Sequence, residues 1–398
     1  MIVWMLACSP EPCADGYGRN AAGACVALES DAPSEAAPDD SDTPPVEGGD
    51  TGGDTGEPGP DHTARVQALL DLLGALFDGL DVEVLADAGD GLTDPRDLEI
   101  NPDRPDELWV VNRSDDSMLV VFDFDSAERT SIHYVGEGND HWLAQPAALA
   151  FGDEGQLGTT HESDGDPAFG SSAADAMGPT LWTTDLDIFD GGDAGHIDMV
   201  HNGALSMGMA WDHDTVYWIH DGYHEAIVRY DFGEPHEPGG RDHEDAVLHR
   251  YLAGEVLREA DVPSHMALDH DTGLLYWADP AGNAVRVLDT NSGTQTGEQW
   301  GTTGFEANWE VADATSWVLV EGTEAGLTRP SGLELIDGVL VLTDHAASEV
   351  VAFDLDGQEL ARLETTWPEG TLMGLEVDEQ GRLYLVDALA GQVLRLAP

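Results

Sequence analysis

The chain has 398 residues, with 79 Asp and Glu against 15 basic residues, and its formal net charge at pH 7 is -64. All the basic residues are Arg and none is Lys. The absence of Lys excludes a phosphate-binding P-loop and Schiff-base catalysis, because both need a Lys side chain. Nucleic acid is excluded as a partner, since its phosphate backbone requires clustered basic residues, and anionic membrane surfaces are disfavoured for the same reason.

The acidity belongs to the whole chain. Residues 1–62 hold 13 acidic residues and one Arg, so most of the negative charge lies further on, in the part that we expect to fold. A surface this acidic favours solubility in a high-salt habitat, where screening relieves the self-repulsion. Binding of divalent cations is the alternative interpretation.

The first eight residues, MIVWMLAC, are apolar but much too short to span a bilayer. They resemble the end of a bacterial lipoprotein signal, in which Cys8 carries the lipid after cleavage. The resemblance implies an exported protein of the cell envelope, lipid-anchored or periplasmic or extracellular, that touches the membrane only through its anchor. The alternative is a disordered apolar N-terminus.

A short segment over 9–27 follows, and Cys13 and Cys25 bracket its Gly- and Ala-rich part. This part holds too little apolar material for a core, so we expect a disulfide between the two cysteines. Two free thiols are the alternative for a cytoplasmic chain. Residues 28–61 are rich in Pro, Gly, Asp and Ser, which predicts a disordered acidic linker that acts as a tether. Its GGDTGGDTG stretch leaves calcium binding open.

Helical periodicity appears next, over residues 62–80. Apolar residues recur at three- and four-residue spacing, namely Val66, Leu69, Leu70, Leu73, Leu76, Phe77 and Leu80. This spacing predicts one amphipathic helix.

From residue 81 to the end, the sequence repeats itself. Six copies open with a Pro or a small or apolar residue and continue with short alternating runs typical of strands; they begin at Pro95, Pro146, Ser206, Pro263, Pro330 and Leu372. In three copies, two Asp residues share a spacing of ten, as in Asp221 and Asp231. The repeats predict an all-β fold, a six-bladed β-propeller of four-stranded blades. The last copy lacks its outer strand, and Val82–Leu85 is the expected donor.

These residues resemble the NHL-repeat and YWTD-type propellers, because LYWAD at Leu275–Asp279 is close to the YWTD signature. The resemblance covers about residues 82–398. It implies the fold strongly and the function weakly, since such folds carry scaffolds, receptors, lactonases and lyases.

In propellers of this kind, the loops that enter the first strands and leave the second strands converge around the central channel. We therefore expect a ligand-binding face there, and its candidate residues are Arg96, Asp97, Trp142, Tyr223, Ser264 and Ser331. The insertion from His161 to Trp182 is expected to be either a binding loop on this face or an exposed decoration.

Seven His residues map to the same face, and neutral imidazoles beside carboxylates suit a transition metal. The candidate metal ligands are His161, His220 and His265, for Zn or Ca. The alternative is that the recurrent Asp residues cap turns and that His simply occupies surface positions in a Lys-free protein.

Two related propeller groups bind metal. The resemblance to peptidyl-amidating lyases implies zinc-binding His residues directly after the blade openings, but those positions hold Arg96, Ala147, Met207, Ser264, Ser331 and Met373. The gluconolactonase group uses a ring of carboxylate and amide ligands, for which Asp97, Asn112 and His265 are partial candidates. The stretch HEDAVLH lacks the His spacing of a zinc protease. No motif of a nucleophilic Ser or Cys or of a dinucleotide site is present.

The sequence thus favours an exported, lipid-anchored, monomeric propeller that binds a small molecule or a protein partner without catalysis. A metal-dependent lyase or lactone hydrolase with its site at the channel is the second hypothesis. A propeller that serves only as a spacer is the third.

Overall fold

The computed structural model describes residues 17–19, 25–27, 62–136, 143–153, 155–164, 177–189, 195–201, 203–240, 242–297 and 306–398. The chain divides into two units, Met1–Glu57 and Pro58–Pro398. In the first, β1 (Tyr17–Arg19) pairs with β2 (Cys25–Ala27) in antiparallel register. Cys25 begins β2, whereas Cys8 and Cys13 lie outside the described residues.

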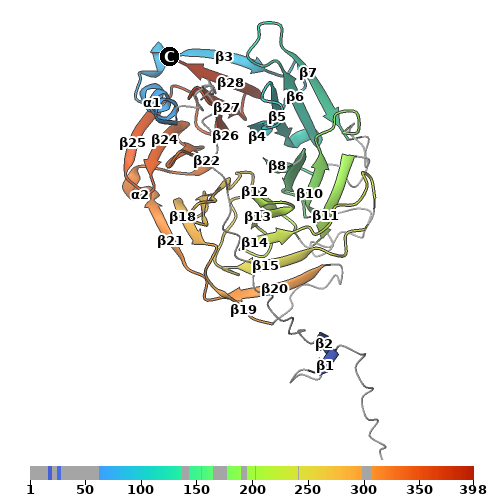
Figure 1. Cartoon of the computed structure of the whole chain (residues 1–398). Helices are drawn as coiled ribbons and strands as arrows, with labels where there is room; N and C mark the ends of the chain where they lie inside the picture. Colours follow the sequence, from blue (N-terminus) through green and yellow to red (C-terminus); the bar gives the residue numbers. More distant parts are fainter. Residues whose placement is uncertain are drawn as a thin grey trace, which may run out of the picture. The chain divides into compact units, whose positions relative to one another are not determined.

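The second unit is a six-bladed β-propeller, as the repeats predict, with its blades arranged around a central axis (Figure 1). The first, innermost strands are β4 (Pro95–Ile100), β8 (Pro146–Phe151), β12 (Ser206–His213), β16 (Met266–Asp269), β22 (Pro330–Ile336) and β26 (Leu372–Val377). The second strands are β5 (Glu107–Asn112), β9 (Gln156–His161), β13 (Val216–Asp221), β17 (Leu274–Asp279), β23 (Val339–Asp344) and β27 (Leu383–Asp387).

The outer half of each blade is built in the same way. The third strands are β6 (Ser117–Phe122), β10 (Met177–Thr183), β14 (Ala226–Asp231), β18 (Ala284–Asp289), β24 (Glu349–Asp354) and β28 (Gln392–Ala397). The fourth strands are β7 (Thr130–Val135), β11 (His196–His201), β15 (Val247–Tyr251), β21 (Ser316–Glu321), β25 (Glu359–Glu364) and β3 (Asp81–Ala86). The pairing of β3 with β28 confirms the predicted donor strand and joins the two ends of the domain.

The blades pack face to face, which explains the apolar second strands. Each second strand is covered on both sides by neighbouring blades, so β5 is buried along its whole length and does not alternate in polarity. Large aromatic side chains, among them Trp109, Trp218 and Trp277, are completely buried between blades. The core is therefore a ring of blade interfaces around the channel.

One blade departs from the predicted four strands. The third sheet has six, because β20 (Ala307–Ala312) and β19 (Thr294–Gln295) extend it beyond β15. Both come from the long connection between β18 and β21 of the fourth blade, and β20 runs parallel to β15. The long fourth repeat thus donates strands to its neighbour.

The predicted helical span 62–80 divides into two pieces. Helix α1 (His62–Leu73) ends before Gly74, and a 3-10 turn, η1 (Phe77–Gly79), follows. Leu69, Leu72 and Leu73 are buried in a core cluster with strands of the fifth and sixth blades, whereas Leu76 is 85% exposed. A second helix, α2 (Gly322–Ala325), is one turn long. Within the described ranges, no helix is long and apolar enough to cross a membrane.

Candidate functional site

The recurrent Asp residues at the ends of second strands are turn caps. The carboxylate of Asp344 accepts backbone N–H groups from Arg329 at 2.9 Å and from Ala346 at 3.1 Å. Asp221, Asp279 and Asp387 accept N–H groups of the turns that follow them in the same way. The structural interpretation of these residues is therefore confirmed. Asn112 takes the equivalent place in the first blade, where its Oδ1 accepts from Thr93 and Asp94.

His161 and His220 lie between blades, because both belong to second strands. Both are completely buried, and burial lowers the pKa of each to about 4, so both imidazoles are neutral at pH 7. His161 Nε2 lies 3.0 Å from Thr159 Oγ1, and neither ring nitrogen of His220 has a hydrogen-bond partner. The structure does not bring His161, His220 and His265 together as a group with donor atoms within 4.8 Å of one another.

His265 instead meets Asp97. Its Nδ1 lies 3.3 Å from Asp97 Oδ1, and both residues are 5% exposed. Asp97 belongs to the first blade and His265 precedes β16 of the fourth, so the pair spans a six-bladed ring from opposite sides. His265 Nε2 has no hydrogen-bond partner. A buried ring nitrogen without a partner is uncommon in folded proteins and calls for a specific explanation.

Three further carboxylates lie on innermost strands, near enough to this pair or to each other to interact electrostatically. Glu99, Glu334 and Glu376 occupy the same position in the innermost strands β4, β22 and β26. All three are half-buried. Glu99 Oε2 accepts the backbone N–H of Phe151 at 2.9 Å, and Asp97 Oδ2 accepts that of Leu149 at 3.0 Å. Asp97 and Glu99 thus bridge the innermost strands β4 and β8, which belong to separate sheets. We call Asp97, Glu99, Glu334 and Glu376 the channel carboxylates.

Their environment favours protonation. Burial raises the pKa of Glu334 to about 7, and the nearby charge of Asp97 acts in the same direction. Burial first and neighbouring carboxylates second raise the pKa of Glu99 and Glu376 well above the usual range. Burial also raises the pKa of Asp97, against the opposing effect of His265. Like charges that share a confined site resist ionising together, so an added positive charge would relieve this repulsion.

The channel carboxylates do not form a cage for a single ion. No three of them offer oxygen atoms that all lie within 4.8 Å of one another, in the part of the chain that the structure describes. A calcium ion needs six to eight oxygen ligands at about 2.3–2.6 Å. The channel carboxylates thus lack the clustering that a calcium site needs.

An ion-pair network joins loops of the first and second blades to the connection that precedes β16. Arg113 lies 3.2 Å from Glu162 Oε2 and 3.0 Å from Asp261 Oδ1, and Arg258 also pairs with Glu162. Arg96 donates to the backbone oxygen of Asp261 at 2.9 Å. Asp261 belongs to the connection between β15 and β16, so this connection reaches the first and second blades on the rim.

The structure describes five of the six ligand candidates from the sequence. Arg96, Asp97, Ser264 and Ser331 all lie at the top of innermost strands, where Ser331 Oγ donates to Pro263 O at 3.0 Å and Ser264 Oγ has no partner. Tyr223 lies in the turn after β13 and is 45% exposed. Trp142 lies outside the described residues.

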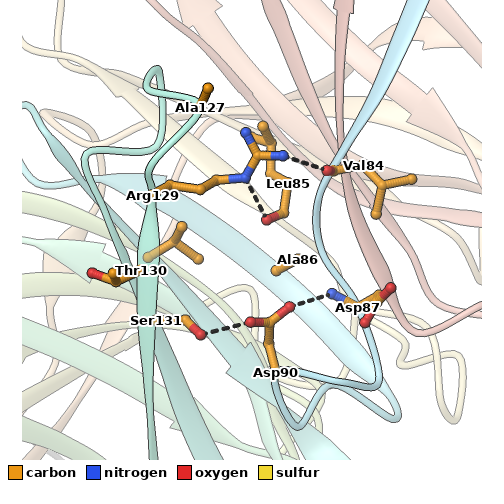
Figure 2. A pocket seen from close by; sticks show the side chains of 10 residues that line it. Val84, Leu85, Ala86, Asp87, Asp90, Ala127, Arg129, Thr130 and Ser131 are labelled. Carbon is orange, nitrogen blue, oxygen red and sulfur yellow. Dashed lines mark hydrogen bonds between the residues drawn. The ribbon is translucent and has the colours of Figure 1, made fainter.

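A hollow of about 340 Å³ lies where the last blade meets the first (Figure 2). Its side chains hold the ring closed: Arg129 donates to the backbone oxygens of Leu85 at 3.0 Å and Val84 at 2.9 Å. Ser131 donates to Asp90, whose other oxygen accepts the N–H of Asp87. These groups are already paired with each other, so the hollow is part of the closure.

Sequence reasoning missed Glu99, Glu334 and Glu376, although the signal was present. The openings PRDLEI, PSGLEL and LMGLEV carry Glu at the same place. In the first blade this Glu reaches the neighbouring innermost strand, because Glu99 Oε2 accepts the N–H of Phe151 in β8. The shared Glu becomes visible when the repeats are aligned residue by residue.

Comparison with solved structures agrees with this fold. A Bacteroides thetaiotaomicron protein of unknown function matches 80% of this chain and 76% of its own, with 11% identity and a TM-score of 0.52. An auxiliary nutrient binding protein from the same species matches 82% and 75%, with 12% identity and a TM-score of 0.52. A streptogramin B lyase matches 81% and 99%, with 11% identity and a TM-score of 0.45.

No protein-family profile and no curated protein sequence matches the chain. At the low identities of the solved structures, the similarity establishes the fold alone. The chain is therefore a six-bladed β-propeller, similar in fold to an auxiliary nutrient binding protein.

Proposed function

We propose that the protein is an exported, lipid-anchored, monomeric propeller that binds a small organic cation in its central channel, without catalysis. The observation that carries this proposal is the set of channel carboxylates beside His265, whose Nε2 is buried and without a partner. Carboxylates accept hydrogen bonds from ammonium and guanidinium groups, and such charge-assisted bonds are stronger than neutral ones.

The spread of the carboxylates favours an extended cation. Because no three of their oxygens lie close enough to surround one ion, a chain with two separated amines suits the wall better than calcium does. The raised pKa values of the channel carboxylates support a cationic ligand further, because a bound cation would offset the repulsion that opposes their ionisation. The acidic surface would steer such a ligand toward the protein.

Two further observations support a binding role. Proteins named auxiliary nutrient binding proteins share the fold, so this architecture is compatible with ligand capture. The apolar segment 1–8, which ends in Cys8, supports a lipid anchor. The Pro- and Gly-rich linker after it supports a tether that holds the propeller away from a membrane.

The test uses putrescine as the probe and butanediol of the same chain length as its neutral control. Isothermal titration of the full chain should show binding of putrescine and none of butanediol. Asp97→Asn and Glu334→Gln should each weaken binding at least about tenfold, the loss expected when one partner of a buried charge pair is removed. Glu379→Gln, at an exposed position outside the channel, is the matched control and should bind as the parent does.

Equal affinity for putrescine and butanediol would refute the cation proposal. So would wild-type affinity in both channel variants, because the channel would then not be the site.

One observation favours a second candidate function. Asp97 orients His265 through Nδ1 and leaves Nε2 free, the arrangement of a general base held by a carboxylate. A lyase or lactone hydrolase would use it to abstract a proton. Turnover of simple lactones that is lost in His265→Gln would support this candidate, and turnover that persists in this variant would remove His265 from the reaction.

A further inference from the structure

A group of three histidines lies away from the channel, at the boundary of the second and third blades. His196 is the first residue of β11, and His236 and His243 belong to the connection between β14 and β15. Their donor atoms all lie within 4.8 Å of one another. Strand β11 is the outer strand of its blade (Figure 1), so this group is separate from the channel carboxylates.

The backbone builds this group. The connection runs along β11, since the N–H of His236 donates to Ile197 O and that of Gly239 donates to His196 O, both at 2.9 Å. Gly240 keeps room for the ring of His236, because a Cβ there would lie 2.6 Å from His236 Nδ1. At the base of the connection, Asp245 accepts the N–H of Glu234 at 2.8 Å. The three rings are thus placed by paired backbone.

The ring geometry suits a shared ion. His236 Nδ1 lies 2.7 Å from the backbone oxygen of Glu237, so Nδ1 carries the proton and donates it. This leaves the lone pair on Nε2, as in most metal-binding histidines, whose second nitrogen is held by a carbonyl or carboxylate. His236 Nε2 lies 3.1 Å from His243 Nε2. Two nitrogens bound to one tetrahedral zinc at about 2.0–2.1 Å would be about 3.4 Å apart, so little movement is needed.

The donor set decides which kind of ion fits this group. Imidazole ligands select zinc, copper, nickel and related ions over calcium and magnesium. His236 and His243 are half-buried, which leaves a side of the group open to water.

We propose that His196, His236 and His243 bind one transition-metal ion, for which Zn²⁺ is the probe, and that the ion fastens the β14–β15 connection to β11. Three protein ligands leave the fourth tetrahedral position to water. The ion joins parts of two blades that are otherwise held here by hydrogen bonds and ring contacts.

The test uses the full chain without a polyhistidine tag, stripped with chelator and desalted. Co²⁺ is added in the presence of excess Mg²⁺ and Ca²⁺, which occupy surface carboxylates. One equivalent should give the visible absorption of tetrahedral Co²⁺, without the charge-transfer band of thiolate ligands, and Zn²⁺ should displace it. The affinity should fall as the pH is lowered, because protonated imidazole does not bind metal.

Matched variants locate the ion. His236→Ala should weaken Zn²⁺ binding by more than about 100-fold, since even second-shell changes cost 10–100-fold. His213→Ala, at an exposed His in the same blade, should leave it unchanged. In chelator the parent and His236→Gln should melt at similar temperatures, and Zn²⁺ should raise the melting temperature of the parent alone.

The proposal is overturned if no tetrahedral Co²⁺ spectrum forms, or if His236→Ala binds as tightly as His213→Ala. A thiolate band would also overturn it, because it would place the ion on the cysteines of the N-terminal unit.

Discussion

The carboxylate of Glu334 illustrates how an acidic side chain inside the fold lowers stability when it ionises. In the unfolded chain its pKa is close to 4.5, whereas burial near Asp97 raises it to about 7 in the folded protein. Between these two values the folded state holds more protons than the unfolded state. The contribution of this group to stability is therefore fully present below pH 4.5 and is lost as the pH rises through 7.

Glu334→Gln removes this loss. At pH 5 the variant and the parent should have similar free energies of unfolding, and at pH 8 the variant should be more stable by roughly 1–3 kcal/mol. Denaturant unfolding at both pH values measures the difference. The exposed control Glu379→Gln should follow the parent at both. A variant less stable than the parent at pH 8 would show that Glu334 ionises at no cost in the fold.

At the residue scale, the repeats predict where a residue lies along its blade better than which residue of another blade it contacts. In the structure Arg96 and Asp97 lie in β4, Ser331 lies in β22, and Ser264 lies two residues before β16. The sequence does not reveal that Asp97 pairs with His265, because the pair depends on the width of the channel. The sequence also does not reveal the group of His196, His236 and His243, because this group forms only where a strand of one blade meets a connection of the next.

Elements were predicted where the pattern is local. Alternating runs and turn residues define the blades, and a missing outer strand identified β3 as the donor. The two extra strands β19 and β20 were not predicted, because β20 pairs with a neighbouring blade in parallel and nothing within its own sequence marks that partner. Helix α1 ends before Gly74, as expected from the low helix propensity of Gly, although the apolar spacing continues beyond it.

Helix α1 gives a matched pair of variants. Leu69 is completely buried against the fifth and sixth blades, so Leu69→Ala should lower the free energy of unfolding by about 2–5 kcal/mol through lost burial and the cavity left behind. Leu76→Ala, at a residue that is 85% exposed, should change it by less than about 0.5 kcal/mol. Chemical denaturation of the full chain provides both numbers. Equal effects would mean that α1 does not dock on the propeller.

At the scale of the whole molecule, the net charge of -64 makes the stability depend on salt. Repulsion among surface carboxylates destabilises the compact state, and salt screens it, because the Debye length falls from about 10 Å at 0.1 M to about 3 Å at 1 M. The melting temperature should thus rise by several degrees over this range. Sorbitol at matched osmolality separates screening from solvent exclusion. A melting temperature independent of salt would contradict the role given to the surface charge.

The central claim is that a cation replaces protons among the channel carboxylates. Its most direct test is titration of the full chain with putrescine near pH 7 in two buffers of different ionisation enthalpy, which counts the protons exchanged on binding. Because the pKa of Glu334 is about 7 and those of Glu99 and Glu376 are also raised, binding should release protons, and less so in Glu334→Gln. Binding without proton release, or release unchanged in that variant, would contradict the account.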